Sequence, residues 1–273
     1  MSQLKIVLID VAWGDSIFLE AKDNQGKESY ALIDSNDSTN YKSTLIFLRK
    51  YFQKKFGTSK IDKPLLDWVM LSHAHLDHGQ GLKEIMRFFG AKRFYYPKSI
   101  QNSSLAHLQH YANRVGIIHQ AIDNNRNFPD FGDAKVKILW PQEDEDLSDN
   151  ENNNSIILAI TQDNKSAIFT GDAEEEVWNS IKNNIPNNTA FFKVPHHGSI
   201  NGTLDHSGNG TWTTKCANSV FLGMSTHNRP YNHPHQEVLN VLNNSGYSFA
   251  RTDENYHIEV VISSGPLKSK YSV

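Results

Sequence analysis

Three histidines and one aspartate lie within six residues in the segment VMLSHAHLDHGQGL, residues 69–82. His73 and His75 are two residues apart, and on an extended backbone such residues point to the same side, so both could bind one metal ion. Asp77 and His78 follow on a bending loop and could turn toward a second ion. Imidazole nitrogen and carboxylate oxygen are ligands of zinc. The spacing therefore predicts a metal site, with three histidines on a polar surface loop as the simpler alternative.

Further candidate ligands follow two later strand-like runs. Asp172 stands in IFTGDAEEE, where a carboxylate could bridge two metals or cap the helix that follows. His196 and His197 stand in KVPHHGS, again at the end of a strand-like run. We expect one of them to complete the second metal position and the other to bind substrate or a ligand, and we favour His196 as the metal ligand.

A third histidine group occurs in THNRPYNHPHQE, residues 226–237. His233 precedes Pro234, at which a helix is expected to start. A histidine presented on this loop could bind substrate or protonate a leaving group. The alternative is that His233 only caps the helix.

The elements that must position these residues can be read from hydrophobic periodicity. Apolar runs at 4–10, 16–21 and 29–34 predict an antiparallel meander, and 43–56 has the spacing of an amphipathic helix. The run 65–72 predicts a buried strand that leads into the histidine motif. Strands followed by helices occur twice, which favours two packed sheets with helices outside. Further expected elements are helices over 81–90, 104–116 and 233–246, and a final hairpin formed by 247–253 and 256–263.

Composition narrows the possible classes of protein. The 273 residues include 27 Lys and Arg against 30 Asp and Glu, a net charge of −3, so no basic excess indicates nucleic-acid binding by the whole surface. Cys216 is the single cysteine, which excludes a disulfide within the chain. The start has no basic segment before its short apolar run, and no stretch approaches about 20 apolar residues. We expect one domain over residues 1–273 of a soluble, cytoplasmic protein.

Taken together, these motifs resemble the metallo-β-lactamase superfamily, whose fold is an αββα sandwich of two mixed β-sheets with metals at one edge. HAHLDH is the hallmark of that superfamily. The chain is more closely similar to the hydrolase domain of competence-type (ComEC-like) DNA-uptake proteins, here without their membrane helices. The segments that carry this resemblance keep their order along almost the whole chain: DVAWGDSIFLE (10–20), LIDSN (32–36), LSHAHLDHGQGL (71–82), NNSIILAI (153–160), IFTGDAEEE (168–176), KVPHHGS (193–199), YNHP (231–234) and RTDENYHIEV (251–260).

The resemblance implies roles for the candidate residues. The first of two divalent metals would be held by His73 and His75, and the second by Asp77 and His78. Asp172 would bridge the two metals and His196 would complete the second position. The set of metal ligands implied is thus His73, His75, Asp77, His78, Asp172 and His196.

The chain also departs from the superfamily pattern. Members often have another histidine ligand before the bridging aspartate, but this region reads ENNNSIIL. Asn153, Asn154 or water could then stand near the first metal, which leaves manganese as an alternative to zinc. Trp13 replaces an amide residue of the first loop, where it could stack on a base or belong to the core.

Two metals about 3.5–4 Å apart can hold a hydroxide that attacks an electrophile. We therefore expect a metal-dependent hydrolase, with Asp77 and His233 as catalytic residues and with His197, Trp13 and Asn154 contacting substrate. A phosphodiesterase or nuclease acting on nucleic acid or a nucleotide is favoured. The alternatives are a hydrolase of a small ester, lactone or cyclic nucleotide, and a non-catalytic metal-containing binding module. Nothing in the sequence indicates a protein partner.

Overall fold

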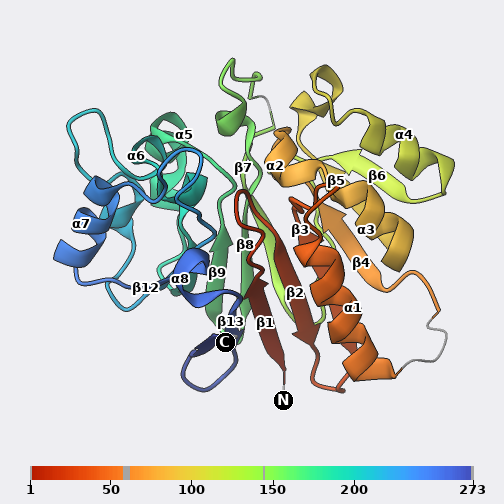
Figure 1. Cartoon of the computed structure of the whole chain (residues 1–273). Helices are drawn as coiled ribbons and strands as arrows, with labels where there is room; N and C mark the ends of the chain where they lie inside the picture. The colour runs from red at the N-terminus through yellow and green to blue at the C-terminus, as the bar shows by residue number, and fades with distance from the viewer. Residues whose placement is uncertain (1, 58–61, 144, 272–273) are drawn as a thin grey trace.

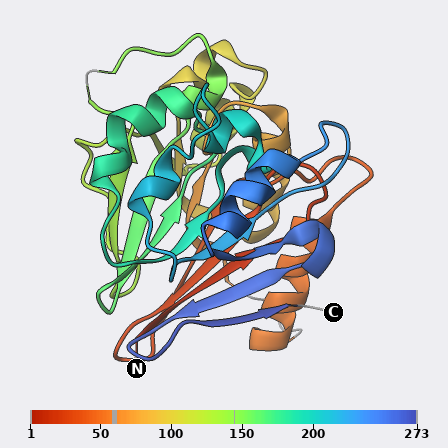
Figure 2. The same ribbon diagram turned by 90° about the vertical axis from the view of Figure 1, so that its left-hand side faces the viewer.

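The computed structural model describes residues 2–57, 62–143 and 145–271. Two β-sheets pack face to face, and helices cover the outer face of each sheet (Figure 1). The view in Figure 2, turned by 90°, shows the helices of the second half lying over their sheet. The layers are thus helix, sheet, sheet and helix, which confirms the predicted αββα sandwich. One domain over residues 1–273 stays a prediction.

The first sheet has eight strands among the described residues, in the spatial order β14-β13-β1-β2-β3-β4-β5-β6. The pairs from β14 to β3 are antiparallel, which confirms the predicted meander, and the pairs from β3 to β6 are parallel. The strands are β1 (Gln3–Leu8), β2 (Ile17–Lys22), β3 (Glu28–Ile33), β4 (Leu66–Met70), β5 (Ala91–Tyr96), β6 (Ile118–Ala121), β13 (Ile258–Ile262) and β14 (Lys268–Tyr271).

The second sheet has six strands within the described part of the chain, in the order β12-β11-β10-β9-β8-β7. Its β7, β8 and β9 pair antiparallel, whereas β9 to β12 pair in parallel. Both sheets are therefore mixed. The strands are β7 (Lys135–Trp140), β8 (Ile157–Gln162), β9 (Lys165–Phe169), β10 (Thr189–Lys193), β11 (Phe221–Met224) and β12 (Ser248–Arg251).

The helices divide between the two outer faces (Figure 1). The first sheet is covered by α1 (Ser43–Phe56), α3 (Leu82–Phe89) and α4 (His107–Arg114), and the second by α5 (Glu175–Ile181), α6 (Ile200–Thr203) and α7 (Gln236–Asn244). None of the described helices has the length and apolarity needed to cross a bilayer. Short helices lie in the connections: α2 (Leu76–Gly79), α8 (Thr252–Asn255), η1 (Lys98–Asn102), η2 (Glu151–Asn154), η3 (Lys182–Asn184), η4 (Pro195–Gly198) and η5 (Trp212–Lys215).

Side-chain alternation in β1 shows how the sequence specifies these layers. Successive residues of a strand point to opposite faces of its sheet. Leu4, Ile6 and Leu8 enter the core between the two sheets, whereas Val7 and Ile9 pack in the layer beneath the helices. A strand with apolar residues on both faces is therefore buried on both sides, as the continuous run LKIVLI indicates.

The predicted final hairpin is wrong. Residues 248–251 form β12 beside β11 in the second sheet, whereas 258–262 form β13 beside β1 in the first. Between them, α8 and Tyr256, with φ of 55°, redirect the chain. Two short apolar runs separated by a turn pair with each other only when no better partner exists, and here each run extends a different sheet. The actual hairpin is β13 with β14.

Candidate metal centre

Six strand ends deliver the polar residues to one edge of the sandwich. Strands β1, β3 and β4 run in the same direction in the first sheet, and so do β9, β10 and β11 in the second. The segments that follow them carry most of the candidate residues. In the order of these strands, the residues are Asp15, Asp34, the group His73 to His78, Asp172, His196 with His197, and His233.

Four side chains converge on one point, which we call the second position. His78 Nε2 lies 3.3 Å and His197 Nε2 3.2 Å from Asp172 Oδ2. Asp77 Oδ2 lies 3.9 Å from each of these two nitrogens. Neighbouring donors around a tetrahedral zinc ion are about 3.3–3.6 Å apart, given metal–ligand distances of about 2.0–2.2 Å. The distances from Asp172 to His78 and His197 fit neighbouring ligands of one such ion, and Asp77 lies slightly farther from the two histidines.

Buried atoms without partners support this fit. His78 and His197 are fully buried, and neither Nε2 atom has a hydrogen-bond partner. Buried polar atoms are nearly always hydrogen-bonded, so an unpartnered pair aimed at one carboxylate is unusual. A cation between these atoms would satisfy both nitrogens.

Three side chains define a neighbouring first position. His73 Nε2 and His75 Nδ1 lie 3.0 Å apart, as expected for residues two apart with a shared direction. His73 is buried and His75 is exposed, and His73 Nε2 lies 3.9 Å from Asp172 Oδ2. Asp172 therefore stands between the two positions, where a bridging carboxylate would have to be.

The amides expected near the first position have other partners. Asn154 donates to Ser148 O and Glu151 Oε2, and its Oδ1 accepts from Ser148 N. Asn153 donates to Glu176, and its Oδ1 accepts from the backbone N–H of Glu174. These hydrogen bonds fix the η2 turn and give the first position no amide oxygen of its own.

The geometry favours His197 over His196 as the further ligand of the second position. His197 is fully buried, whereas the side chain of His196 is 20 % exposed and its Nε2 lies 4.0 Å from Asp172 Oδ2. His196 Nδ1 instead lies 3.0 Å from Glu174 Oε1. Both histidines have left-handed backbones, with φ of 48° and 54°, a conformation that non-glycine residues adopt only under local constraint. This turn sends the ring of His196 toward solvent and the ring of His197 inward.

A second layer of groups holds the ligands in place. Asp34 Oδ2 lies 2.8 Å from His78 Nδ1 and accepts from Ser72 Oγ at 2.6 Å. His197 Nδ1 lies 2.9 Å from the carbonyl oxygen of Ser225. Such contacts on the remote ring nitrogen orient a metal-binding histidine. Asp34 therefore orients the ring of His78 through its remote nitrogen.

A buried cation accompanies the carboxylates. Lys193, fully buried at the end of β10, places its Nζ 2.5 Å from Asp15 Oδ2 and 3.6 Å from Asp172 Oδ1, and donates to Gly171 O. Burial alone would lower the pKa of Lys193, but Asp15 and Asp172 outweigh it and raise this pKa. Lys193 therefore stays charged and neutralises part of the acidic centre.

The loop after β1 approaches the histidine motif closely. Gly14 has φ of 88°, and a Cβ atom there would lie 2.1 Å from the carbonyl oxygen of Asp77. Only glycine fits this contact. Asp15, the next residue, is thereby placed beside His78 and His197, at 3.9 and 3.6 Å.

The electrostatics of the centre favour positive charge. Burial alone would lower the pKa of His78, but Asp172, Asp34 and Asp77 raise it well above its usual value. Burial alone would raise the pKa of Asp172, but His197 and His78 hold it well below its usual range. His73 is the exception, since burial and the nearby His78 lower its pKa. The excess of carboxylates therefore suits divalent cations.

Aromatic rings border the centre. Trp13 is partly buried, and its ring lies 5.0 Å from that of His197, 4.7 Å from Tyr231 and 5.6 Å from His233. Burial and the neighbouring His197, His196 and His235 lower the pKa of His233 to about 3, so its ring is neutral near pH 7. Trp13 and His233 therefore lie at the border of the candidate metal centre.

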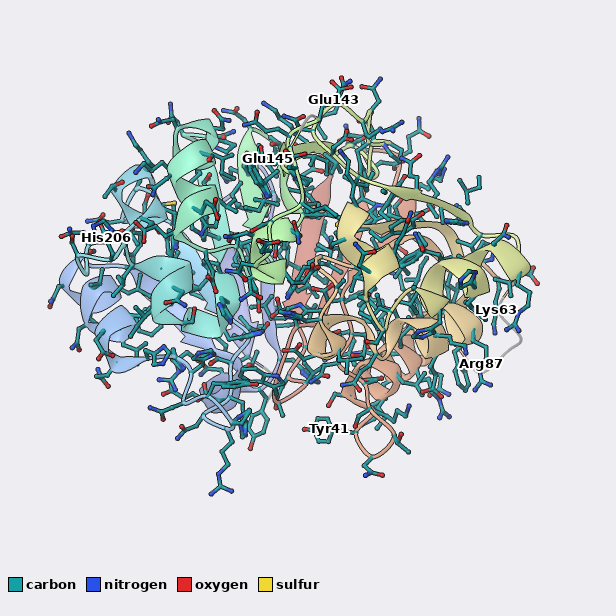
Figure 3. All side chains as sticks on the ribbon, turned by 90° about the horizontal axis from the view of Figure 1, so that it is seen from above. Tyr41, Lys63, Arg87, Glu143, Glu145 and His206 are labelled. Carbon is teal, nitrogen blue, oxygen red and sulfur yellow. The ribbon has the colours of Figure 1, made fainter. Side chains whose placement is uncertain are left out.

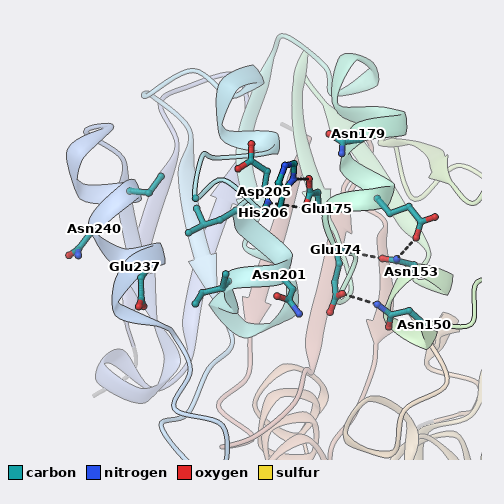
Figure 4. Close-up of a pocket in the computed structure, with 15 residues that line it drawn as sticks. Asn150, Asn153, Glu174, Glu175, Asn179, Asn201, Asp205, His206, Glu237 and Asn240 are labelled. Carbon is teal, nitrogen blue, oxygen red and sulfur yellow. Dashed lines mark hydrogen bonds and ion pairs between the residues drawn. The ribbon is translucent and has the colours of Figure 1, made fainter.

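A large open groove lies beside the centre, between α5, α6 and α7 (Figure 4). Its volume is about 990 Å³, and the described residues that line it include no lysine or arginine. Glu174 connects it to the centre through His196, and Figure 4 shows Glu174 joined to Asn150 and Glu175 to His206. The carboxylates of this acidic groove are Glu174, Glu175, Glu176, Asp205 and Glu237.

The fold and this cluster agree with a comparison to known families. A family model described as Metallo-beta-lactamase superfamily matches residues 26–206, more than half of the chain. The chain therefore belongs to the metallo-beta-lactamase superfamily, and it is a metal-binding hydrolase by fold and site. Among curated proteins it is similar to ComE operon protein 3 of Bacillus subtilis (strain 168), with 27% identity over 271 residues, 94% of this chain and 33% of that protein. It spans about a third of that relative's length.

Solved structures share the fold. Igni18, a metallo hydrolase of the archaeon Ignicoccus hospitalis KIN4/I, has a TM-score of 0.53 and 13% identity, with 99% of this chain and 100% of that chain covered. Zn²⁺-bound PqqB of Methylobacterium extorquens has a TM-score of 0.51 and 12% identity, covering 91% and 97% of the two chains. At these identities the likeness concerns the fold alone.

Sequence reasoning overlooked Lys193, Glu174 and Tyr231. Lys193 was detectable, because a lysine that ends the apolar run AFFK before a histidine pair is an unusual residue to bury. Glu174 belongs to the run AEEE, and acidic residues at the start of a predicted helix are commonly explained by helix capping. Tyr231 begins the segment YNHP beside His233, but no local pattern predicts that its ring packs against Trp13.

Proposed function

We propose that this hydrolase is a metal-dependent phosphodiesterase that acts on a nucleic acid or nucleotide. The observation that carries the proposal is the pair of unpartnered nitrogens, on His78 and His197, aimed at a carboxylate shared with a second cluster of histidines. The resemblance to competence-type DNA-uptake hydrolases supports the substrate class.

In this proposal the ligands divide between two cations. His73, His75 and Asp172 would hold the first, and Asp77, His78, His197 and Asp172 the second, with His197 in the place earlier given to His196. Zinc suits the histidine-rich second position, and manganese is the alternative at the ligand-poor first one. When bound, such a metal pair lowers the pKa of water, polarises a phosphoryl oxygen and stabilises the attacking and leaving oxygens.

The remaining residues position the substrate. The neutral ring of His233 can donate a hydrogen bond to the substrate, because its Nδ1 is buried and has no partner. Trp13 packs against this ring and limits the space beside it. His196 lies near the second position with its side chain partly exposed and can contact a leaving group.

The acidic groove favours a second candidate function, the hydrolysis of a small ester, lactone or cyclic nucleotide. A long phosphate chain would be repelled by five carboxylates. A small substrate, confined to the neighbourhood of the metals, would not meet them.

The test is hydrolysis by protein loaded with zinc or manganese. Single-stranded DNA, RNA, bis(p-nitrophenyl) phosphate and a lactone are compared as substrates. We expect turnover of the phosphodiesters, and loss of that turnover in Asp77→Ala with an unchanged circular dichroism spectrum. Asp130→Ala, at an exposed aspartate, is the matched control and should stay active. Hydrolysis of the lactone alone would select the second candidate, and metal binding without any turnover would select a non-catalytic binding module.

A further inference from the structure

A small pocket opens directly beside the metal centre. Its volume is about 430 Å³, and His196, Ser199, Asn201, Tyr231, His233 and His235 contribute to its lining. Two of these residues connect it to the centre, since His196 Nε2 lies 4.0 Å from Asp172 and the ring of His233 lies 6.3 Å from that of His197. A substrate group bound in this pocket would therefore lie close to the substrate atom that reacts at the metal centre.

One wall of the pocket is an exposed ring held in place by other rings. Tyr231 is 61 % exposed, yet its ring lies 4.7 Å from that of Trp13 and 6.0 Å from that of His233. An aromatic ring supported on one side offers its other face for stacking at little entropic cost. Planar ligands stack on such a face. In phosphodiesters the most common planar groups are nucleobases, and bases of every type can stack in this way.

The pocket also contains an unused polar atom. His233 is 6 % exposed, and its Nδ1 has no hydrogen-bond partner. A buried nitrogen of this kind requires a partner to offset its desolvation. The exposed amide of Asn201 adds a donor and an acceptor at the rim. The edge of a nucleobase carries matching donors and acceptors.

The surroundings limit what can extend beyond the pocket. The acidic groove of Figure 4 shares Ile200 and Asn201 with it, so a chain leaving the pocket on this side would place its phosphates against carboxylates. Trp13 itself lines a separate hollow of about 450 Å³, together with Tyr41. Tyr41 is 46 % exposed and projects at the edge of the molecule in Figure 3. The described residues that line the pocket include no aspartate or glutamate. Among the described residues that line the hollow, Asp77 is the one acidic residue.

We infer that this pocket binds the base of a single nucleotide whose phosphate lies at the metal centre, with the base stacked on Tyr231 and hydrogen-bonded to His233. The inference rests on the proposed function, because it takes the phosphate to be the reacting group. The inference adds that the group next to the phosphate is a nucleobase. It also implies that no further nucleotide extends into the acidic groove.

Tryptophan fluorescence gives a direct test, because Trp13 is the one tryptophan of five that is not buried. Zinc-loaded protein, excited at a wavelength that nucleotides do not absorb, is titrated with adenosine 5′-monophosphate and with ribose 5-phosphate, which lacks the base. We expect the nucleotide to bind at least about tenfold more tightly, as one base–aromatic stack provides. Tyr231→Ala should abolish this difference and Tyr231→Phe should preserve it. Tyr271→Ala, at another exposed tyrosine, is the matched control.

Equal affinity for the two ligands, or an undiminished preference in Tyr231→Ala, would overturn the inference. The measurement reads binding and needs no turnover. Failure of the proposed function is seen separately, as absence of bis(p-nitrophenyl) phosphate hydrolysis, a reaction that does not require a base.

Discussion

The two proposed metal positions of this centre are built differently. At the second, each donor from Asp77, His78, Asp172 and His197 lies 3.2 to 3.9 Å from a neighbouring donor, and all of these residues except Asp77 are buried. The first position has His73 and the exposed His75, and its carboxylate is Asp172, which also belongs to the second position. The amide of Asn154 is hydrogen-bonded to Ser148 instead. In the proposed two-metal centre, the second ion would be held tightly and the first would keep open coordination, where water and substrate can enter.

The difference extends to the outer contacts. The second position has a carboxylate behind His78, a carbonyl behind His197 and a buried lysine behind Asp172. The first has the hydroxyl of Ser72, 3.2 Å from His73 Nδ1. Because preorganised ligands lose less entropy on binding, the second position should fill first when metal is titrated into stripped protein.

The largest expected effect is that of Asp172→Ala, since Asp172 is the one carboxylate common to both positions. We expect both ions to be lost and phosphodiester hydrolysis to fall by at least about a thousandfold, because polarisation by the metals is worth several kcal/mol in the transition state. Metal stoichiometry by plasma mass spectrometry and initial rates check this. Retention of one ion at unchanged affinity would show that Asp172 serves a single position.

Lys193→Met tests the outer support of the second position. Removing the cation leaves Asp15 and Asp172 buried without it, which should destabilise the metal-free protein by about 3 kcal/mol or more. Because the pKa of Lys193 is raised in the fold, its contribution is complete below the pKa of an unfolded lysine and is lost as pH rises through the folded value.

Urea unfolding, with chelator and with zinc, measures that contribution. Added zinc should reduce the difference between wild type and variant, since the ions replace the missing positive charge. Equal stability of the two metal-free proteins would contradict the charge-balancing role of Lys193.

A paired comparison of His197→Ala and His196→Ala separates the two adjacent rings. Loss of an outer partner alone weakens metal binding about 10–100-fold, so loss of a ligand at position 197 should weaken the second ion by at least about 100-fold. His196→Ala should leave that ion within about tenfold of wild type. Competition with a chromogenic chelator gives both affinities. A reversed order would restore His196 as the ligand.

Asn154→Ala should have the smallest effect. Its amide is engaged by Ser148 and Glu151, so we expect the first ion to weaken by less than about tenfold, the lower range for loss of a ligand's partner. The same chelator competition, fitted for the weaker site, measures it. A larger loss would mean that Asn154 turns to the first ion when metal is present, and the contrast between the two positions would narrow.

Much of the fold could be predicted from local pattern. The alternation in β1 and the apolar runs that precede each polar group specify buried strands with chemistry at their ends. The motif from His73 to His78 also works locally, because a spacing of two brings His73 and His75 together without help from the rest of the chain. The sequence by itself therefore determined the class of fold, the edge that carries the site and most of the candidate ligands.

Tertiary structure decided what depends on contacts between distant segments. His196 and His197 are equivalent in sequence, and only the left-handed turn after β10 places one ring inside and the other toward Glu174. Lys193 meets Asp15 because β1 and β10 end at the same edge. Strands β12 and β13 separate because each finds a neighbour in a different sheet. Local periodicity contains no information about such neighbours, since the free energy that selects them arises from burial and charge pairing across the assembled core.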